Sequence, residues 1–164
     1  MKKTIIITSL LSCFSCDQLT KAHASLLLKG NEPLSFVGNV FRLQYAENTG
    51  AMLGAGSHLP ENHKYYVFTI GVGLLLLAAL CYLLIKPLSN ATVLFGSLII
   101  AGGFGNWYDR VLNDGAVVDF INVGIGALRT GIFNVADVTI LIGAIGLIVF
   151  SSNDDASSRK PTKQ

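Results

Sequence analysis

The feature that most restricts the fold is an uninterrupted apolar run from Tyr65 to Ile85, which contains no charged residue. A helix needs about 20 apolar residues to cross a bilayer. Inside hydrocarbon a chain segment must satisfy all its backbone hydrogen bonds, which an isolated strand or loop cannot do. Lys64 and Lys86 bound the run, and the tyrosines at its first end suit a membrane–water interface. The run is therefore predicted to be a transmembrane helix.

Three further runs have similar character, and only 13% of the 164 residues are charged. A soluble domain carries about twice that share. We predict an all-α membrane protein that forms one integral membrane domain over residues 1–164, with four transmembrane helices. The net charge of +2, without a basic cluster on one face, argues against nucleic-acid binding. The predicted spans cover residues 4–24, 65–85, 91–108 and 132–150, and a disordered cytoplasmic tail covers 151–164.

A more polar segment separates the first two spans. Residues 36–45 carry a Gly38-Asn39 turn signal followed by alternating apolar residues, which predicts a small β-hairpin. A loop of small residues around Asn48 follows. We expect the hairpin and the loop to lie on the extracytoplasmic face of the membrane.

Basic residues at the ends of the chain set the predicted orientation. Four spans place both termini on one side, and the positive-inside rule makes the more basic side cytoplasmic. The excess over the other side is modest, so the N-terminus and the tail decide. The cytoplasmic bases are Lys2, Lys3, Lys86, Arg159, Lys160 and Lys163.

The first apolar run has a second interpretation. Lys2 and Lys3 before an apolar stretch resemble a secretory signal, and residues 10–13 (LLSC) resemble a lipobox at which a lipoprotein is lipidated and cut. The return of apolar character in three later runs favours an uncleaved helix. Asp17 and Lys21 are four residues apart and therefore share one face of this helix.

Two carboxylates in apolar surroundings give the strongest functional signal, since ionisable groups at membrane depth are costly and usually functional. Asp119 lies in VVDFI and Asp137 in NVADVTI. A chain reversal at Gly124–Gly131 would bring both to the external membrane boundary. Two carboxylates in contact at low dielectric share one proton. The ionised member can take a proton from water while the protonated member polarises a carbonyl, as in an aspartic protease.

Neighbouring polar residues suit supporting roles. Asn134 lies three residues before Asp137, where it can orient that carboxylate. Asn106 and Arg110 are four apart and project together. Spacing alone leaves two alternatives open, which are a polar contact inside the bundle and an ion or solute relay.

Five motifs occur in the order DQLTK, ENTGAMLG, GGFGNWYDR, VVDFI and FNVADV. In this respect the chain, from Asp17 to Phe150, resembles the lipoprotein signal peptidases, the bacterial type II signal peptidases of aspartyl protease family A8. The motifs begin at Asp17, Glu47, Gly102, Val117 and Phe133.

The resemblance implies a four-helix aspartyl endopeptidase of the bacterial inner (cytoplasmic) membrane. Both termini would be cytoplasmic, and the active site would lie near the periplasmic face. The enzyme would remove the signal peptide from diacylglyceryl-modified prolipoproteins by cleaving just before the lipidated cysteine. The expected partners are these lipid-modified signal peptides and membrane lipid. No cofactor and no metal is implied, and we expect a monomer.

The resemblance also assigns residues. The catalytic pair falls on Asp119 and Asp137. Asp109 and Asp114 are expected to be structural, although Asp114 lies in a stretch one residue longer than the family pattern. The substrate-binding positions implied are Asp17, Lys21, Asn48, Asn106, Arg110 and Asn134.

Overall fold

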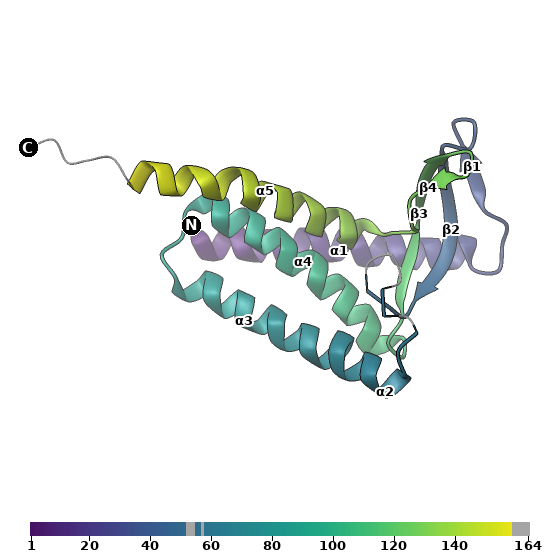
Figure 1. Ribbon diagram of the computed structural model, residues 1–164, viewed down its shortest axis with the longest axis horizontal. Helices are drawn as coiled ribbons and strands as arrows, with labels where there is room; N and C mark the ends of the chain where they lie inside the picture. Colours follow the sequence, from purple (N-terminus) through teal and green to yellow (C-terminus); the bar gives the residue numbers. More distant parts are fainter. Residues whose placement is uncertain (52–54, 57, 159–164) are drawn as a thin grey trace, which may run out of the picture.

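The computed structural model describes residues 1–51, 55–56 and 58–158. In this part of the chain four long helical segments run side by side, and a small sheet lies across one end of them (Figure 1). The second segment is continuous but changes from α to π and back to α helix. The helices are α1 (Lys2–Leu28), α2 (Glu61–Lys64), η2 (Tyr65–Gly71, the π-helical turn), α3 (Val72–Ile85), α4 (Asn90–Leu112) and α5 (Val135–Ser158).

The helices coincide with the four apolar runs, but their ends differ from the predicted ones. The helix α5 begins at Val135 rather than at residue 132 and continues to Ser158. The prediction of a disordered tail from residue 151 is therefore wrong up to Ser158, and residues 159–164 lie outside the described residues. The physical reason is that no glycine or proline interrupts the chain after Phe150 until Pro161, so helical hydrogen bonding can propagate.

Helix α4 lies at the centre of the bundle and packs closely against α5 (Figure 1). A Cβ atom on Gly102 would lie 2.4 Å from the carbonyl oxygen of Ala136, so the two backbones touch where only glycine fits. Helix α3 is held less tightly. The indole N–H of Trp107 donates to the carbonyl of Thr69 at 2.9 Å and fastens the start of this segment to α4.

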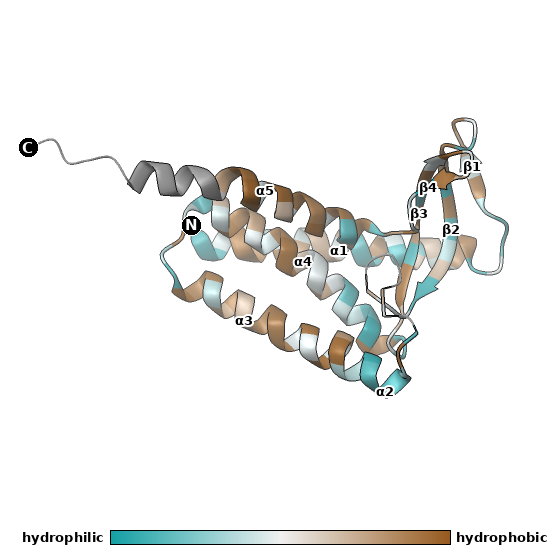
Figure 2. Ribbon diagram, in the orientation of Figure 1, coloured by the Kyte–Doolittle hydropathy of each residue, from teal (hydrophilic) through white to brown (hydrophobic). Residues whose placement is uncertain are grey.

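Apolar residues predominate along α3 and α5 (Figure 2), and many of their large side chains are exposed. Among the described residues, one helical segment, Glu61–Ile85, is long and apolar enough to cross a membrane, and Val135–Phe150 is a shorter apolar helix. Helices α1 and α4 are less apolar because they carry charged residues on their inner faces, among them Asp17 and Asp109.

The described residues are mostly helical, as predicted, but the β structure is larger than the predicted hairpin, because four strands pair in the antiparallel order β1–β2–β3–β4. The predicted hairpin is confirmed, with Phe36 paired to Phe41 across the turn. The third strand lies in the sequence that follows α4, where the β-branched residues of VVDFINVGI favour a strand. The strands are β1 (Leu34–Phe36), β2 (Phe41–Asn48), β3 (Val117–Ile125) and β4 (Leu128–Arg129).

Strand β3 links the sheet to the helices. Phe120 packs against Ala24 and Leu28 at the end of α1. The backbone N–H of Phe133 donates to the carbonyl of Ile121 at 2.9 Å, and this bond leads the chain directly into α5. Asp119 in β3 and the first turn of α5 therefore meet at the same end of the bundle.

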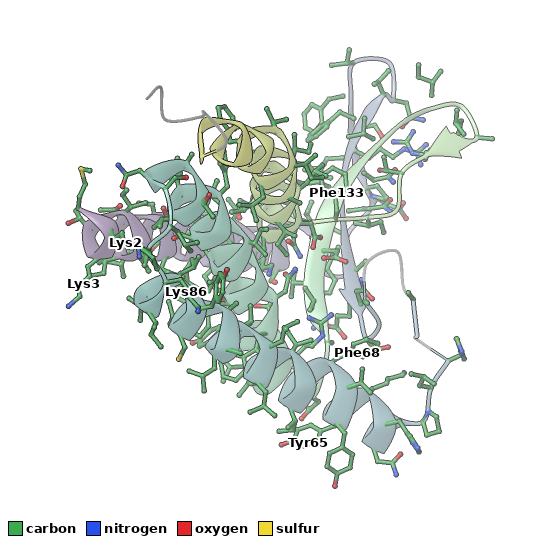
Figure 3. All side chains as sticks on the ribbon, turned by 60° about the vertical axis from the view of Figure 1, so that its left-hand side comes forward. Lys2, Lys3, Tyr65, Phe68, Lys86 and Phe133 are labelled. Atoms are coloured by element: carbon green, nitrogen blue, oxygen red, sulfur yellow. The ribbon has the colours of Figure 1, made fainter. Side chains whose placement is uncertain are left out.

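The two ends of the bundle differ in charge. Lys2, Lys3 and Lys86 gather at the end opposite the sheet (Figure 3). The ammonium of Lys2 donates to the carbonyl of Lys86, which joins the first helix to the end of α3. Helix α5 also ends on this side (Figure 1).

Candidate active site

A buried ion cluster lies where α1 and α4 meet. The ammonium of Lys21 is 2.8 Å from Oδ2 of Asp17 and 2.9 Å from Oδ2 of Asp109, and the lysine is only 3% exposed. It also donates to Oδ1 of Asn106 at 2.9 Å. The charges are costly to desolvate individually, so each depends on its partners in the cluster.

The carboxylates of this cluster hold backbone groups of other elements. Oδ1 of Asp17 accepts the N–H of Ala136 in the first turn of α5 at 2.9 Å. Oδ2 of Asp109 accepts the N–H of Val118 in β3 at 3.1 Å. Gly105 makes this approach possible, because a Cβ atom there would lie 2.6 Å from the Asp17 carboxylate. The cluster therefore sets the positions of α5 and β3, the two elements that carry Asp137 and Asp119.

Asn106 transmits this order toward the cavity. Oδ1 of Asn106 accepts a hydrogen bond from the ammonium of Lys21. The amide nitrogen of Asn106 therefore points the other way and donates to Oδ1 of Asp137 at 2.9 Å. Oδ1 of Asn106 also accepts a hydrogen bond from the amide nitrogen of Asn134 at 3.0 Å. The ammonium thus fixes which end of the Asn106 amide points at the carboxylate.

Asn134 connects the two aspartates. Its amide nitrogen donates to Oδ1 of Asp119 at 2.6 Å. Its Oδ1 accepts the N–H of Asp137 at 3.0 Å, and its own N–H donates to Oδ2 of Asp137 at 3.1 Å. This reciprocal pair is a capping box at the start of α5, with the N-cap at Asn134 and the acidic residue three positions later. Asn134 therefore precedes the helix, although the predicted span of residues 132–150 includes it.

Asp119 accepts a second amide hydrogen bond, from the neighbouring strand β2. Asn48, at the end of β2, donates to its Oδ2 at 3.0 Å. Burial raises the pKa of Asp119 from 3.8 to about 6, because desolvation penalises the charged carboxylate. The hydrogen bond from Asn48 opposes this rise, and the nearby charge of Asp137 adds to it. Asp119 therefore titrates close to neutral pH.

Both aspartates line a cavity of about 380 Å³. Its polar side is formed by Asn48, Asn106 and Arg110 together with the two carboxylates. Its other side is largely apolar, built from the segment before α5 and the outer face of its first turns. These apolar lining residues include Ile132, Phe133, Val138 and Leu141.

Arg110 borders the same cavity and holds the loop after β2. Its Nη2 donates to the carbonyl of Gly50 at 2.6 Å, and its guanidinium lies 5.8 Å from the ring centre of Phe68. Met52, Leu53 and Gly54 of the predicted Asn48 loop lie outside the described residues.

The residues predicted for the site fall into two groups. Asp119, Asp137, Asn48, Asn106 and Arg110 line the cavity. The second group is buried behind the described cavity and does not line it. Its members are Asp17, Lys21 and Asn134.

Three residues outside the predicted site complete this description. Gln18 donates to Oδ1 of Asp109 at 2.9 Å, and sequence reasoning did not single it out although it is part of the DQLTK motif. Asp109 was expected to be structural and has contacts of that kind. Asp114 is exposed in the turn between α4 and β3, with a positive φ of 50°.

Comparison with known proteins identifies the family. Residues 9–153 match the profile of the family described as signal peptidase (SPase) II. The chain belongs to this family. A lipoprotein signal peptidase of Caldicellulosiruptor bescii is 35% identical over 141 residues, which cover 86% of this chain and 85% of the relative. One from Streptococcus thermophilus is 33% identical over 160 residues, covering 96% and 99%.

A solved structure supports the same assignment at the level of the fold. It is described as a bacterial membrane enzyme studied by the in meso method at 2.3 Å resolution. It superposes with a TM-score of 0.80 at 29% identity, covering 97% of this chain and 93% of that chain. The resemblance found in the five motifs is thus confirmed, and the fold is that of a membrane enzyme.

Family membership decides between the alternatives left open by the sequence. The chain is an aspartic peptidase of the signal peptidase II family rather than an ion or solute relay. The match includes residues before Cys13, and α1 runs unbroken through this cysteine. Neither observation supports a lipoprotein that is cut at Cys13.

Proposed function

We propose that this chain is a signal peptidase II that removes the signal peptide from diacylglyceryl-modified prolipoproteins by cleaving just before the lipidated cysteine. Family membership supports the reaction. The observation that carries the assignment of residues is the bridge by Asn134, which hydrogen-bonds both Asp119 and Asp137 at one cavity. These two aspartates are the proposed catalytic pair.

The proposed chemistry needs one proton shared by the pair. The raised pKa of Asp119, about 6, keeps a carboxylic acid accessible near neutral pH. The ionised member takes a proton from a water molecule, and the water oxygen attacks the scissile carbonyl carbon. The protonated member gives its proton to the carbonyl oxygen. Collapse of the tetrahedral intermediate then breaks the C–N bond, and the leaving amine accepts a proton from the pair.

Three asparagines orient the carboxylates for this step. Asn48, Asn106 and Asn134 each donate an amide hydrogen to one of the two aspartates. Amide donors fix the carboxylates without neutralising them, so the pair can still exchange a proton. In this proposal Lys21, with the carboxylates it binds, positions Asn106 and does not touch substrate.

We further propose that the four helical segments are four transmembrane spans with both termini in the cytoplasm. The basic end formed by Lys2, Lys3 and Lys86 supports this orientation in the inner membrane. The sheet and the aspartate pair then lie at the periplasmic face. A monomeric enzyme is part of the same proposal.

The cavity also suits a lipid-modified substrate. A peptide bond can lie against the polar side, where the aspartates are, while acyl chains follow the apolar side beside Phe133 and Leu141. The attachment of diacylglycerol next to the scissile bond would bring both parts into the cavity together.

A cleavage assay tests the proposal. The full-length protein in lipid nanodiscs is given a prolipoprotein peptide that carries diacylglyceryl on its cysteine, and the same peptide without lipid. Mass spectrometry should find cleavage directly before the cysteine in the lipidated peptide and little in the other. Equal cleavage of both peptides would contradict the proposed substrate class, and failure to cleave either would contradict the activity.

A further inference from the structure

The ends of the two β-hairpins lie side by side. The first hairpin turns between β1 and β2, and the second between β3 and β4. The N–H of Gly124 donates to the carbonyl of Val40 at 2.8 Å, and Nη1 of Arg129 donates to the carbonyl of Asn39 at 2.8 Å. These bonds join the two turns into one surface, which we call the hairpin tip and define as residues 36–42 and 124–129.

Exposed apolar side chains dominate the hairpin tip. Val37 is 79% exposed, Ile125 is 76% exposed and Leu128 is 85% exposed. Turns on a water-facing surface normally carry small polar residues or glycine instead. Neighbouring Phe36 is also exposed. The tip therefore presents an apolar cluster where a soluble turn would present a polar one.

Val37 is also conformationally unfavourable. Its φ is +52°, in the left-handed region where a β-branched residue is rarely found. This conformation is unfavourable for an L-residue because its Cβ atom crowds the following carbonyl oxygen. Asparagine or glycine would avoid most of this cost. An exposed valine held in a strained turn points to a role outside the folded chain itself.

The charged residues of the tip are both basic. Arg42 and Arg129 lie next to the apolar cluster, and the sequence contains no acidic residue between Glu32 and Glu47 or between Asp119 and Asp137. Neither arginine forms an ion pair with any residue that the structure describes. Desolvation lowers the pKa of Arg129, and the like charge of Arg42 lowers it further.

The tip also lies where it can reach a bilayer surface. The strands run across the direction of the helices, and the hairpin ends extend sideways beyond the outline of α5 (Figures 1 and 3). If the helices cross the membrane as proposed above, the tip overhangs the lipids that surround the bundle on the periplasmic side.

We propose that the hairpin tip is a second membrane contact, which inserts its apolar side chains at the level of the lipid headgroups and binds anionic phospholipid through Arg42 and Arg129. Interfacial apolar residues enter roughly 5–10 Å into a bilayer surface. The positive charge of a basic side chain at the membrane surface attracts anionic lipid headgroups. This inference rests on the proposed topology. It would hold β3, and with it Asp119, at a constant height above the membrane, where a bond beside a lipid anchor must be cut.

Site-directed spin labelling tests this contact without measuring cleavage. The three native cysteines are first replaced by alanine, and single cysteines for labelling replace Val37 or Leu128. In nanodiscs that contain phosphatidylglycerol, both labels should collide several-fold more often with oxygen than with a water-soluble nickel complex. Asn31, exposed on the loop before β1, carries the control label and should give the opposite ratio. Retained thermal stability of each variant shows that the sheet is folded.

Lipid charge and arginine variants complete the test. Replacing phosphatidylglycerol by phosphatidylcholine, or combining Arg42→Gln with Arg129→Gln, should reduce the ratio of oxygen to nickel collisions for the label at position 128. Arg42→Lys keeps the positive charge and should therefore retain most of this ratio. Labels that report water at both tip positions would overturn the proposal, as would immobilised labels shielded from both reagents, which indicate a protein contact. Because no step depends on catalysis, a failed cleavage assay and a failed labelling experiment remain distinguishable.

Discussion

Removing the amide of Asn134 should raise the pKa that governs activity. This amide donates to Oδ1 of Asp119 at 2.6 Å in a buried environment. A hydrogen bond to a charged group contributes roughly 1.5–3 kcal/mol, and 1.36 kcal/mol corresponds to one pH unit. Without the donor, the ionised carboxylate loses that stabilisation, and the pKa of Asp119 should rise from about 6 to roughly 7–8.

Two substitutions separate this effect from the capping role of Asn134. Asn134→Ala removes both the donor to Asp119 and the N-cap of α5, and loss of the cap costs about 1 kcal/mol of stability. Asn134→Ser keeps an N-cap acceptor but is too short to replace the amide at Asp119. Asn122→Ala serves as the control. Asn122 lies in β3, the strand that carries Asp119, and its amide is hydrogen-bonded to Arg129 and Thr130.

The assay is the pH dependence of kcat/KM for the diacylglyceryl peptide, which reports ionisations of the free enzyme. Because the two aspartates titrate as a coupled pair, the measured midpoint belongs to the pair. The alkaline limb, on which the protonated member of the pair loses its proton, should move to higher pH by roughly one to two units in both Asn134 variants. It should not move in Asn122→Ala. An unchanged limb in Asn134→Ser, with the stability of the native protein, would refute the positioning of Asp119 by this amide.

Three other substitutions test the energetics. Lys21→Met leaves two buried carboxylates without their cation and should destabilise the protein by roughly 3–5 kcal/mol. Lys29→Met, at an exposed ion pair, should have little effect on stability, and similar melting temperatures of the two variants would contradict this reasoning. Asp119→Asn should raise Tm at pH 8 but not at pH 4. The native carboxyl has a pKa raised from 3.8 to about 6, so it contributes stability below pH 4 that is lost as pH rises through 6. This loss is about 3 kcal/mol at 1.36 kcal/mol per pH unit. An equal Tm change at both pH values would argue against burial as the cause of the raised pKa. Gly102→Ala should weaken packing of α4 on α5, because its Cβ would lie 2.4 Å from a carbonyl oxygen, while Gly71→Ala, with 3.4 Å of clearance, should be tolerated; equal stability losses would contradict the close approach.

Hydropathy located the helical segments but not their ends. The run from Tyr65 to Ile85 is a helix because only a helix satisfies its backbone in hydrocarbon. The start of α5 at Val135 was missed although its signal is local. Asn134 followed three residues later by Asp137 is a capping-box pattern, and this pattern places the first helical residue after Asn134.

Strand β3 was missed for a different reason. Its apolar residues suit a buried strand, but its main partner is β2, which lies before three of the four long helical segments have ended, with Ala46 paired to Asp119. A register between such distant segments has no signature in either segment alone. The same holds for Lys21 and Asp109, since spacing predicts the pairing of Lys21 with Asp17 on one helix but says nothing of a carboxylate on α4.

The functional residues were predicted from motifs rather than from geometry. Asp119 and Asp137 stood out as carboxylates in apolar sequence, yet their connection through Asn134 depends on how β3 meets α5. The separation of cavity-lining Asn106 from buried Asp17 was equally beyond sequence, because both are polar residues of membrane helices in family motifs.

The most direct test of the central claim is cleavage of a diacylglyceryl-modified prolipoprotein by Asp119→Asn and Asp137→Asn, with Asp114→Asn as the matched control. Asp114 is exposed in the turn before β3, and its positive φ suits asparagine, so this control removes a carboxylate without strain. The proposed mechanism predicts loss of cleavage in the first two variants, with inserted and folded protein, and near-native cleavage in the third. Full activity in either Asp119→Asn or Asp137→Asn would contradict the shared-proton mechanism.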